Sequence, residues 1–415
     1  VDQPGADNED LYFGLQDDGA WATRRAVPDN SDWDNVACCD VFDIVADDTR
    51  ALFSLFSAFS LNLTDPGFQN ATSINPPPNA GQQGNANFNF PDFLDQYGPN
   101  QYVAVTSSGM YITTDITASP VVWTQVGAGS TPAGGFTSVQ VAMSGGTPTF
   151  YAQTTAIGVA EQQPPAQLWR YVGTGAGTWQ RIDNNDGLTG GLGIFAVDPN
   201  DPNRLYASNF GGPAGIQMVF STDGGTNWDV DTELDNLMTT GGYVRYQTQA
   251  GPTSFAHITG FQGYAQPSLL AFDPENPNNI AAGGRDSGLF ISSDSGNSWR
   301  LLTDPIDSGN TGVPHLPRPF YAYIDHEPIA SNKVYIGTQG RGIWLVDFSD
   351  FDLTPDEFEP NNTTATATIL GSLPKITLRD LTIHTAADVD FFQYTAQDTG
   401  KLVINLLDDF NGVLD

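Results

Sequence analysis

Basic residues are scarce in this sequence. Lysine and arginine together number 15 against 48 acidic residues, which gives a formal net charge of −33 at pH 7. Binding to nucleic acid requires a basic face that displaces counterions from phosphates, so this charge excludes a nucleic-acid partner. It argues equally against binding to an anionic membrane surface. The acidity favours solubility in the first place, and a dependence on salt or divalent cations in the second.

Cysteine is almost absent: the chain contains two, and they are neighbours, Cys38 and Cys39. Neighbouring cysteines cannot cross-link distant segments, and a disulfide between them is strained. The further ligands that a zinc site needs at suitable spacing are missing. We therefore interpret the pair as two small, half-buried residues that give no argument for export.

Long apolar runs and long helical patterns are also missing. No stretch reaches the ~20 apolar residues of a membrane-spanning helix, so we expect no membrane insertion. A signal peptide is not recognisable, and Val1 is not an initiator, which we interpret as a processed or fragmentary chain. Glycine (44) and proline (28) are instead frequent, and aromatic residues make up 11%. This turn-rich composition predicts an all-β protein.

What the sequence does contain is an internal repeat. Residues 195–208 and 270–283 both give an apolar strand, an Asp-Pro turn and a second apolar strand, with Asp198 and Asp273 at equivalent positions. Residues 93–105 follow the same plan, with Asp95 as the turn residue. Such turns recur at seven places, 45 to 75 residues apart: Asp2, Asp47, Asp95, Ser144, Asp198, Asp273 and Asp325. Units of four short strands at this period predict a β-propeller of at least seven blades, the first of them beginning in a truncated strand at Val1.

A second repeat covers the next hairpin of each unit. Residues 13–21, 282–290 and 336–344 align without gaps, with glycine at the second and seventh positions and an aromatic residue at the ninth. Glycine at a fixed turn position supplies a positive φ between two short strands. The alignment therefore predicts equivalent hairpins in three blades.

The third motif is the Asp box, S/T-x-D-x-G-x-T/S-W. Residues 292–299 fit it at every position, and residues 221–228 differ only at Asn227. In such a turn the aspartate accepts hydrogen bonds from turn amides, the glycine takes a left-handed conformation and the tryptophan packs on the blade. Looser boxes end at Trp123 and Trp179. We therefore predict a structural role for the box residues Ser221, Asp223, Gly225, Trp228, Ser292, Asp294, Gly296 and Trp299.

These motifs resemble the BNR/Asp-box superfamily, which includes sialidases, xyloglucan-type glycoside hydrolases, photosystem-assembly propellers and the sortilin ectodomain. The resemblance covers about residues 1–350 and implies the propeller fold. It does not imply one activity, because the superfamily contains both hydrolases and binding modules.

The character of the sequence changes after a linker at 351–358. Four short segments, 356–363, 365–371, 381–384 and 388–394, resemble the bacterial pre-peptidase C-terminal domain, a small secreted β-sandwich. The resemblance implies a partial β-sandwich over 359–415 and a secreted or cell-surface bacterial protein. In relatives of this domain some acidic positions bind calcium, and the matching candidates here are Asp388 and Asp390.

Propeller geometry places a candidate ligand site. We letter the strands of a blade A to D from the inside outwards. Because strands alternate in direction, A–B turns and Asp boxes are expected on one face, and B–C hairpins and D–A connections on the other. Three long insertions, 54–90, 236–267 and 304–319, fall between blades or beyond strand B, and loops on a rigid scaffold commonly carry function.

On this second face we predict ligand-binding residues whose aromatic and charged side chains suit a glycan or a protein: Arg245, Tyr246, His257, Tyr264, Arg285 and Arg341. The alternatives are a lid packed on its own aromatic residues and ion pairs between blades. No catalytic constellation stands out, since the histidines lack triad or metal-site spacing and the Arg-Ile-Pro motif of sialidases is missing. A glycoside hydrolase would need two carboxylates across a cleft; the candidates on this face are Asp17, Asp18 and Asp286.

We therefore expect a secreted or cell-surface bacterial propeller that acts as a binding or structural module of a larger extracellular protein. No cofactor is required, and calcium is the one metal that the sequence suggests. One alternative is a secreted glycoside hydrolase acting on a polysaccharide. Another is a repeating subunit of an extracellular assembly built from copies of this chain.

Overall fold

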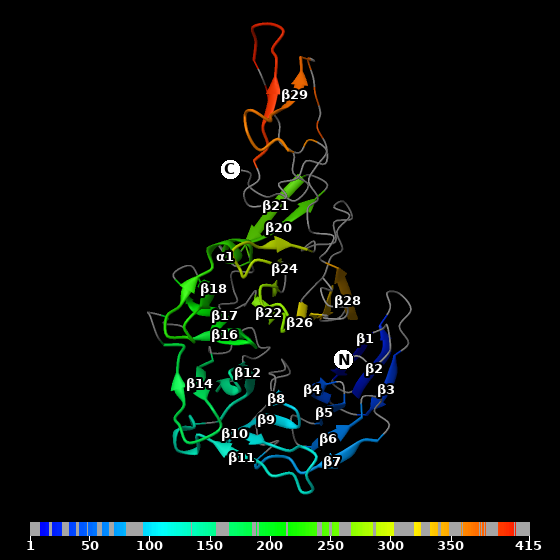
Figure 1. Ribbon diagram of the computed structural model, residues 1–415, viewed down its shortest axis with the longest axis vertical. Helices are drawn as coiled ribbons and strands as arrows, with labels where there is room; N and C mark the ends of the chain where they lie inside the picture. The colour runs from blue at the N-terminus through cyan, green and yellow to red at the C-terminus, as the bar shows by residue number, and fades with distance from the viewer. Residues whose placement is uncertain are drawn as a thin grey trace.

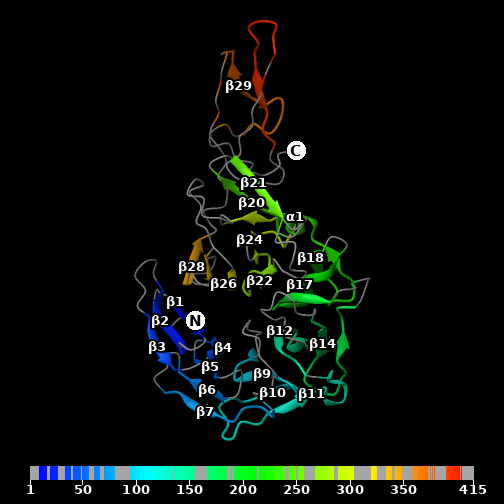
Figure 2. The ribbon, with the colours of Figure 1, turned by 180° about the vertical axis from the view of Figure 1, so that it is seen from behind.

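The computed structural model shows sheets that follow one another around a ring, with a C-terminal extension beyond it (Figures 1 and 2). In the part of the chain that it describes, no helix is long and apolar enough to cross a membrane. The described residues are 9–15, 19–26, 33–38, 41–47, 49–55, 60–65, 70–79, 94–133, 135–154, 166–184, 188, 191–212, 215–238, 243–248, 251–256, 267–284, 288–302, 319–324, 333–338, 342–347, 358, 360–372, 374, 376, 378, 389–401 and 403.

Six blades of a β-propeller are resolved, and all but one have four antiparallel strands. The four-stranded blades are β4 (Val41–Asp47), β5 (Arg50–Leu55), β6 (Ser60–Thr64) and β7 (Thr72–Ile74); β8 (Leu94–Gly98), β9 (Gln101–Thr106), β10 (Gly109–Thr113) and β11 (Thr124–Val126); β12 (Ser138–Ser144), β13 (Thr147–Gln153), β14 (Leu168–Val172) and β15 (Gln180–Arg181); β16 (Leu192–Asp198), β17 (Asp201–Gly212), β18 (Gly215–Ser221) and β19 (Asp229–Val230); and β22 (Pro267–Phe272), β23 (Ile280–Gly284), β24 (Gly288–Ser292) and β25 (Arg300–Leu301). The sixth has three described strands, β26 (Pro319–Ile324), β27 (Lys333–Thr338) and β28 (Gly342–Asp347).

A further three-stranded sheet at the start of the chain consists of β1 (Glu9–Leu15), β2 (Gly19–Ala26) and β3 (Asp34–Ala37). Its hairpin closes with Gly19 opposite Leu15, as Gly288 closes β23–β24 and Gly342 closes β27–β28. All three glycines have a positive φ, of 83°, 92° and 75°. This confirms the hairpin alignment.

Neighbouring blades pack through their inner strands and share apolar cores. The first strand of each resolved blade contacts the first strand of the next, from β4 to β26. The largest apolar cluster joins three consecutive blades and includes Leu61, Tyr102, Phe150 and Trp179. Because each core lies between two sheets, the stability of one blade depends on its neighbours.

The predicted turn at Asp95 is wrong. Asp95 lies inside β8, and the β8–β9 turn follows at Pro99 and Asn100. The match to Asp198-Pro199-Asn200-Asp201 is therefore Gly98-Pro99-Asn100-Gln101, three residues further on. Asp95 instead accepts a hydrogen bond from Val141 N of the next blade, 2.8 Å away. The turns at Asp47 and Ser144 are confirmed, while Asp2 and Asp325 lie outside the described residues.

Two expectations about insertions change. The stretch 54–90 is not one long insertion, because it supplies strands β6 and β7. The stretch 236–267 begins in the last residues of a short helix, α1 (Thr232–Met238), and contains a two-stranded hairpin, β20 (Tyr243–Thr248) and β21 (Gly251–Ala256). A single-turn 3-10 helix spans Ala128–Ser130.

The cysteine interpretation is also wrong. Cys38 is exposed and disulfide-bonded, and since the chain has only two cysteines its partner is Cys39, which lies outside the described residues. Cys38 directly follows β3, and β4 begins at Val41, so the bond lies in the three-residue connection between these strands.

The described residues beyond 357 form one parallel pair of strands, β29 (Thr368–Gly371) and β30 (Phe392–Tyr394). Phe358 packs edge-on against Phe392, with ring centroids 5.8 Å apart. A β-sandwich is not shown by this part of the described chain. In Figure 1, β29 lies beyond β20 and β21, outside the ring.

Candidate functional site

The turn between strands A and B has the same internal structure in two successive blades. In β16–β17, one oxygen of Asp198 accepts from Asn200 N (2.9 Å) and Asp201 N (3.2 Å). In β22–β23, Asp273 accepts from Glu275 N (2.9 Å) and Asn276 N (3.0 Å). The second oxygen of each aspartate accepts a hydrogen bond from the side chain six residues later, Arg204 for Asp198 and Asn279 for Asp273. The predicted equivalence of Asp198 and Asp273 is confirmed.

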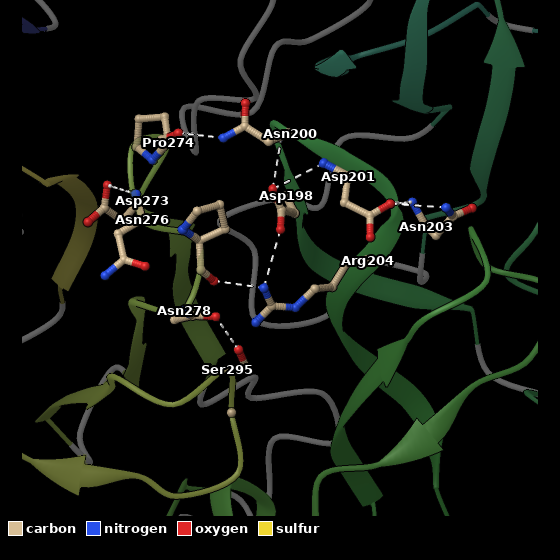
Figure 3. A network of polar contacts seen from close by, with 12 residues as sticks. Asp198, Asn200, Asp201, Asn203, Arg204, Asp273, Pro274, Asn276, Asn278 and Ser295 are labelled. Carbon is tan, nitrogen blue, oxygen red and sulfur yellow. Dashed lines mark hydrogen bonds and ion pairs between the residues drawn. The ribbon is translucent and has the colours of Figure 1, made fainter. Parts of the chain in front are cut away.

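These two turns are joined to each other by polar contacts, which Figure 3 shows from close by. Asn200 donates from its side-chain nitrogen to Pro274 O of the next blade. Arg204 pairs with Asp198 (3.3 Å), donates to Pro277 O (2.8 Å) and lies 5.1 Å from the ring centroid of Phe272. The network fixes one blade against its neighbour, because its donors and acceptors come from both.

Both full Asp boxes adopt the predicted turn. In residues 292–299, Asp294 accepts from Ser298 N (2.9 Å) and from Ser298 Oγ (2.7 Å), and Gly296 N donates to Ser292 Oγ (2.8 Å). In residues 221–228 the side-chain amide of Asn227 replaces the missing hydroxyl and donates to Asp223. Burial raises the pKa of Asp223 and Asp294, but the hydrogen bonds outweigh it and hold both below the usual range.

The Asp boxes and the A–B turns lie on the same face, as predicted. The fourth residue of each box has a left-handed conformation, with φ of 72° at Gly224 and 71° at Ser295. Its N–H donates to the carbonyl of the A–B turn in its own blade: Gly224 N to Asn203 O (2.9 Å) and Ser295 N to Asn278 O (3.0 Å). The opposite face is therefore left to the B–C hairpins and the D–A connections.

Tryptophans link successive blades at four places. Each indole N–H donates to a residue at or just after the outer strand of the preceding blade: Trp123 to Asn75 O (2.9 Å), Trp179 to Val126 O (3.4 Å), Trp228 to Ile182 O (3.1 Å) and Trp299 to Asp231 Oδ2 (2.8 Å). The two looser boxes have thus lost most of the motif but keep this link. The interior of the described propeller is therefore held by repeated polar contacts as well as by apolar packing.

Asp231 is a buried carboxylate that accepts hydrogen bonds from residues of two blades. It is 5% exposed, and it accepts from Tyr206 Oη (3.0 Å), Trp299 Nε1 (2.8 Å) and Leu234 N (2.9 Å). The last contact caps the start of α1. Burial, together with the charge of Asp231, raises the pKa of Tyr206 well above its usual range. Sequence reasoning missed this residue because it lies outside every motif.

Glu233 gives a pH-dependent prediction at the same junction. Partial burial, and then the charges of Asp231 and Asp294, raise the pKa of Glu233. A carboxyl whose folded pKa lies above its unfolded value destabilises the fold when ionised, and this effect disappears as the pH falls through the folded pKa. We expect Glu233→Gln to raise the free energy of unfolding at pH 7 by less than about 1 kcal/mol, because the group is partly exposed, and so to raise the melting temperature slightly. Thermal denaturation at pH 7 and pH 4 tests this; an equal gain at both values would contradict it.

Salt dependence is a second expectation from the electrostatics. Within the described residues two ion pairs are present, Arg181–Asp183 (2.8 Å) and Arg204–Asp198 (3.3 Å), against a net charge of −33 for the chain. Most acids therefore repel one another, and at 1 M salt this repulsion is screened within about 3 Å. We expect the melting temperature to rise between low salt and 1 M NaCl, and not in an equally concentrated neutral osmolyte. A melting temperature independent of salt would contradict this.

Most of the predicted site residues lie outside the described residues: Asp17, Asp18, Asp286, His257, Tyr264, Arg285, Arg341 and Asp388. Arg245 and Tyr246 lie in β20, opposite Ser254 and Thr253 of β21. Asp390 precedes β30, and the described residues contain no group of three or more His, Cys, Asp or Glu side chains that could hold a metal ion.

Comparisons with known proteins concern the fold. No protein-family model and no curated protein matches the sequence. Among solved structures, YCF48 from Cyanidioschyzon merolae has a TM-score of 0.48 at 14% identity, covering 84% of this chain and 98% of that one. An ancestral GH74 enzyme has a TM-score of 0.42 at 16% identity (74% and 36% covered), and the GH74 enzyme of Niastella koreensis 0.32 at 14% (81% and 75%). The propeller fold follows from the ring of sheets described above, and these solved structures are similar to the chain at low identity.

Proposed function

We propose that this chain is an Asp-box propeller that serves as a binding or structural module of a larger secreted or cell-surface protein. The strongest support is that five aspartates of the turns and blade junctions serve as hydrogen-bond acceptors within the scaffold. Asp198, Asp223, Asp231, Asp273 and Asp294 all accept hydrogen bonds from turns or neighbouring blades. Carboxylates committed in this way hold a scaffold together and are poorly suited to act as acid and base.

The ligand site that we propose is the face of the B–C hairpins and D–A connections, at the hairpin β20–β21. Along the chain this hairpin lies between β19, the fourth strand of one blade, and β22, the first strand of the next. Along β20, positions 243, 245 and 247 alternate with 244, 246 and 248, so Arg245 and Tyr246 belong to opposite faces of the hairpin.

This alternation gives a matched pair of variants. We expect one of Arg245→Ala and Tyr246→Ala to weaken binding at least tenfold, and the other to leave it nearly unchanged, because a ligand can contact one face of the hairpin at a time. Glycan-array binding followed by affinity measurement tests this. Unchanged affinity in both variants would place the ligand elsewhere.

The alternative function is a secreted glycoside hydrolase with two carboxylates from Asp17, Asp18 and Asp286. Sugar-binding clefts are usually lined by accessible aromatic rings. Among the described residues, the strongly exposed large apolar side chains are valine, leucine and isoleucine, such as Val122 and Leu237, and none is aromatic. The described residues therefore do not form a sugar cleft lined by aromatic rings, and Asp17, Asp18 and Asp286 lie outside them.

An extracellular location is supported by the disulfide at Cys38, because disulfides persist mainly in oxidising compartments. The bacterial origin, the partial C-terminal β-sandwich and calcium binding at Asp388 and Asp390 rest on the resemblance of the sequence. Association of copies of this chain into an assembly remains the third proposal, and analytical ultracentrifugation at several concentrations tests it.

We also propose that the ring has seven blades. The sheet β1–β3 supplies strands B, C and D of the additional blade, and the sequence predicts the end of strand A at Val1 and the A–B turn at Asp2. We expect deletion of residues 1–8 to lower the melting temperature by several degrees, since it removes this turn and the end of a strand that packs on two neighbours. An unchanged melting temperature would contradict the seventh blade.

A further inference from the structure

Four asparagines occupy the Asn-x-Ser/Thr sequence of an acceptor for N-linked glycans: Asn62, Asn70, Asn361 and Asn362. The sequence alone does not distinguish between these four candidate sites. A glycan is bulky and hydrated, so a folded protein can carry one only where the side-chain nitrogen reaches water. Asn70 and Asn362 are exposed, whereas Asn361 is buried and Asn62 is half-buried within a sheet.

Asn62 and Asn361 are poor acceptors. Asn62 lies in the third strand of its blade, between Phe53 of β5 and Ser73 of β7, and Thr64 of the same sequon is 4% exposed. Asn361 is completely buried, and its carbonyl accepts from Phe391 N (3.1 Å). A sugar at either position would have to displace packed chain.

Asn70 is accessible. Asn70, Ala71 and Thr72 are all exposed, and they lead into β7, the outer strand of the blade. The side-chain nitrogen of Asn70 donates to Asp65 Oδ2 (2.6 Å). A side-chain amide has two N–H groups, and glycosylation replaces one, so this hydrogen bond can persist in the modified protein.

Asn362 is accessible as well. Asn362 and Thr364 are exposed, and the side-chain oxygen of Asn362 accepts from Val389 N (3.0 Å). A glycan attaches at the nitrogen and leaves this oxygen free to accept. The contact that orders Asn362 is therefore compatible with modification.

We propose that Asn70 and Asn362 are sites of N-linked glycosylation. The co-reactant is a lipid-linked oligosaccharide: a bond forms between the asparagine nitrogen and C1 of the first sugar, the bond from C1 to the diphosphate carrier breaks, and the nitrogen loses one proton. The proposal rests on the proposed export of the chain, because such donors are found on export pathways. It requires a source organism that glycosylates exported proteins, so it does not rest on the bacterial origin that the sequence resemblance implies.

The test is secretion of the full chain, behind a heterologous signal sequence, from a eukaryotic host that glycosylates exported proteins. Peptide mapping before and after enzymatic glycan removal is expected to show modification at Asn70 and Asn362, and none at Asn62 or Asn361. Glycans on Asn62 or Asn361 of the folded protein, or unmodified Asn70 and Asn362, would overturn the proposal. This outcome is independent of whether the propeller binds a ligand or hydrolyses one.

The overlapping sequons provide matched controls that leave the asparagines intact. Thr364→Ala is expected to remove the glycan at Asn362, whereas Thr363→Ala, which disrupts only the sequon of Asn361, is expected to leave it in place. Thr72→Ala should remove one glycan and Thr72→Ser retain it. If secretion of the chain fails, translation into microsomes followed by protease digestion selects folded material for the same mapping.

Discussion

Replacing Gly296 by alanine is expected to lower the free energy of unfolding by about 2–5 kcal/mol. Gly296 has a φ of 85°, and an alanine in the left-handed region costs about 1–2 kcal/mol. In addition, a Cβ atom at this position would lie 1.8 Å from Tyr206 Oη. Overpacking of this kind typically costs about 1–3 kcal/mol. Tyr206 cannot simply withdraw, because it donates to Asp231 and packs edge-on against Trp299.

Gly342→Ala is the control for this prediction. Gly342 has a similar φ of 75°, but a Cβ atom there would meet nothing within 4 Å. In this variant only the cost of the left-handed backbone conformation applies, and we expect the free energy of unfolding to fall by about 1–2 kcal/mol. Denaturant titration of both variants measures the difference. Equal losses would show that the Asp box is not packed against Tyr206 as described.

Asp231→Ala is expected to be the most damaging single change among the described carboxylates, with a loss of about 3–7 kcal/mol. It would leave the Tyr206 hydroxyl and the Trp299 indole N–H buried without an acceptor, at about 1–3 kcal/mol each. It would also remove the cap of α1, worth about 1 kcal/mol.

Asp229→Ala separates this effect from a loss of charge. Asp229 is exposed in β19, two residues before Asp231, and it carries the same charge. Surface substitutions of this type usually stay within about 0.5 kcal/mol. The free energies of unfolding of the two variants should therefore differ by several kcal/mol. Similar stabilities would mean that Asp231 does not join the two blades.

The sequence was sufficient where the chemistry is local. Asp198 and Asp273 bond amides two and three residues away, and Asp223 and Asp294 bond groups four residues away, so a short motif contains the whole contact. The alignment fails at Asp95 because Gly98 occupies the position of the turn aspartate in this blade, and Asp95 is the nearest aspartate in the sequence. The short, uneven strands at 60–64 and 72–74 were hidden inside an apparent insertion for a related reason: no motif marks their ends.

The contacts between blades could not be predicted in this way. Asp231 bonds Tyr206 and Trp299, which are 25 and 68 residues away in the sequence. Asp43, Asp95 and Gln140 accept backbone N–H groups from the inner strand of the following blade, over separations of 46 to 57 residues. These partners meet only because the blades are arranged side by side, so a local pattern cannot reveal them. Of the predicted ligand residues, Arg245 and Tyr246 lie in the hairpin β20–β21, for which no motif was available, and the others lie outside the described residues.

A screen for polysaccharide hydrolysis tests the central claim, that the propeller is a binding or structural scaffold, most directly. The purified full chain would be incubated with a panel of plant, bacterial and animal polysaccharides, and reducing ends would be measured over time. The account predicts that the native protein releases no more reducing ends than the heat-denatured protein does, including from any polysaccharide whose glycans it binds on the array. Steady release of product that Asp17→Ala, Asp18→Ala or Asp286→Ala abolishes would contradict it and establish a hydrolase.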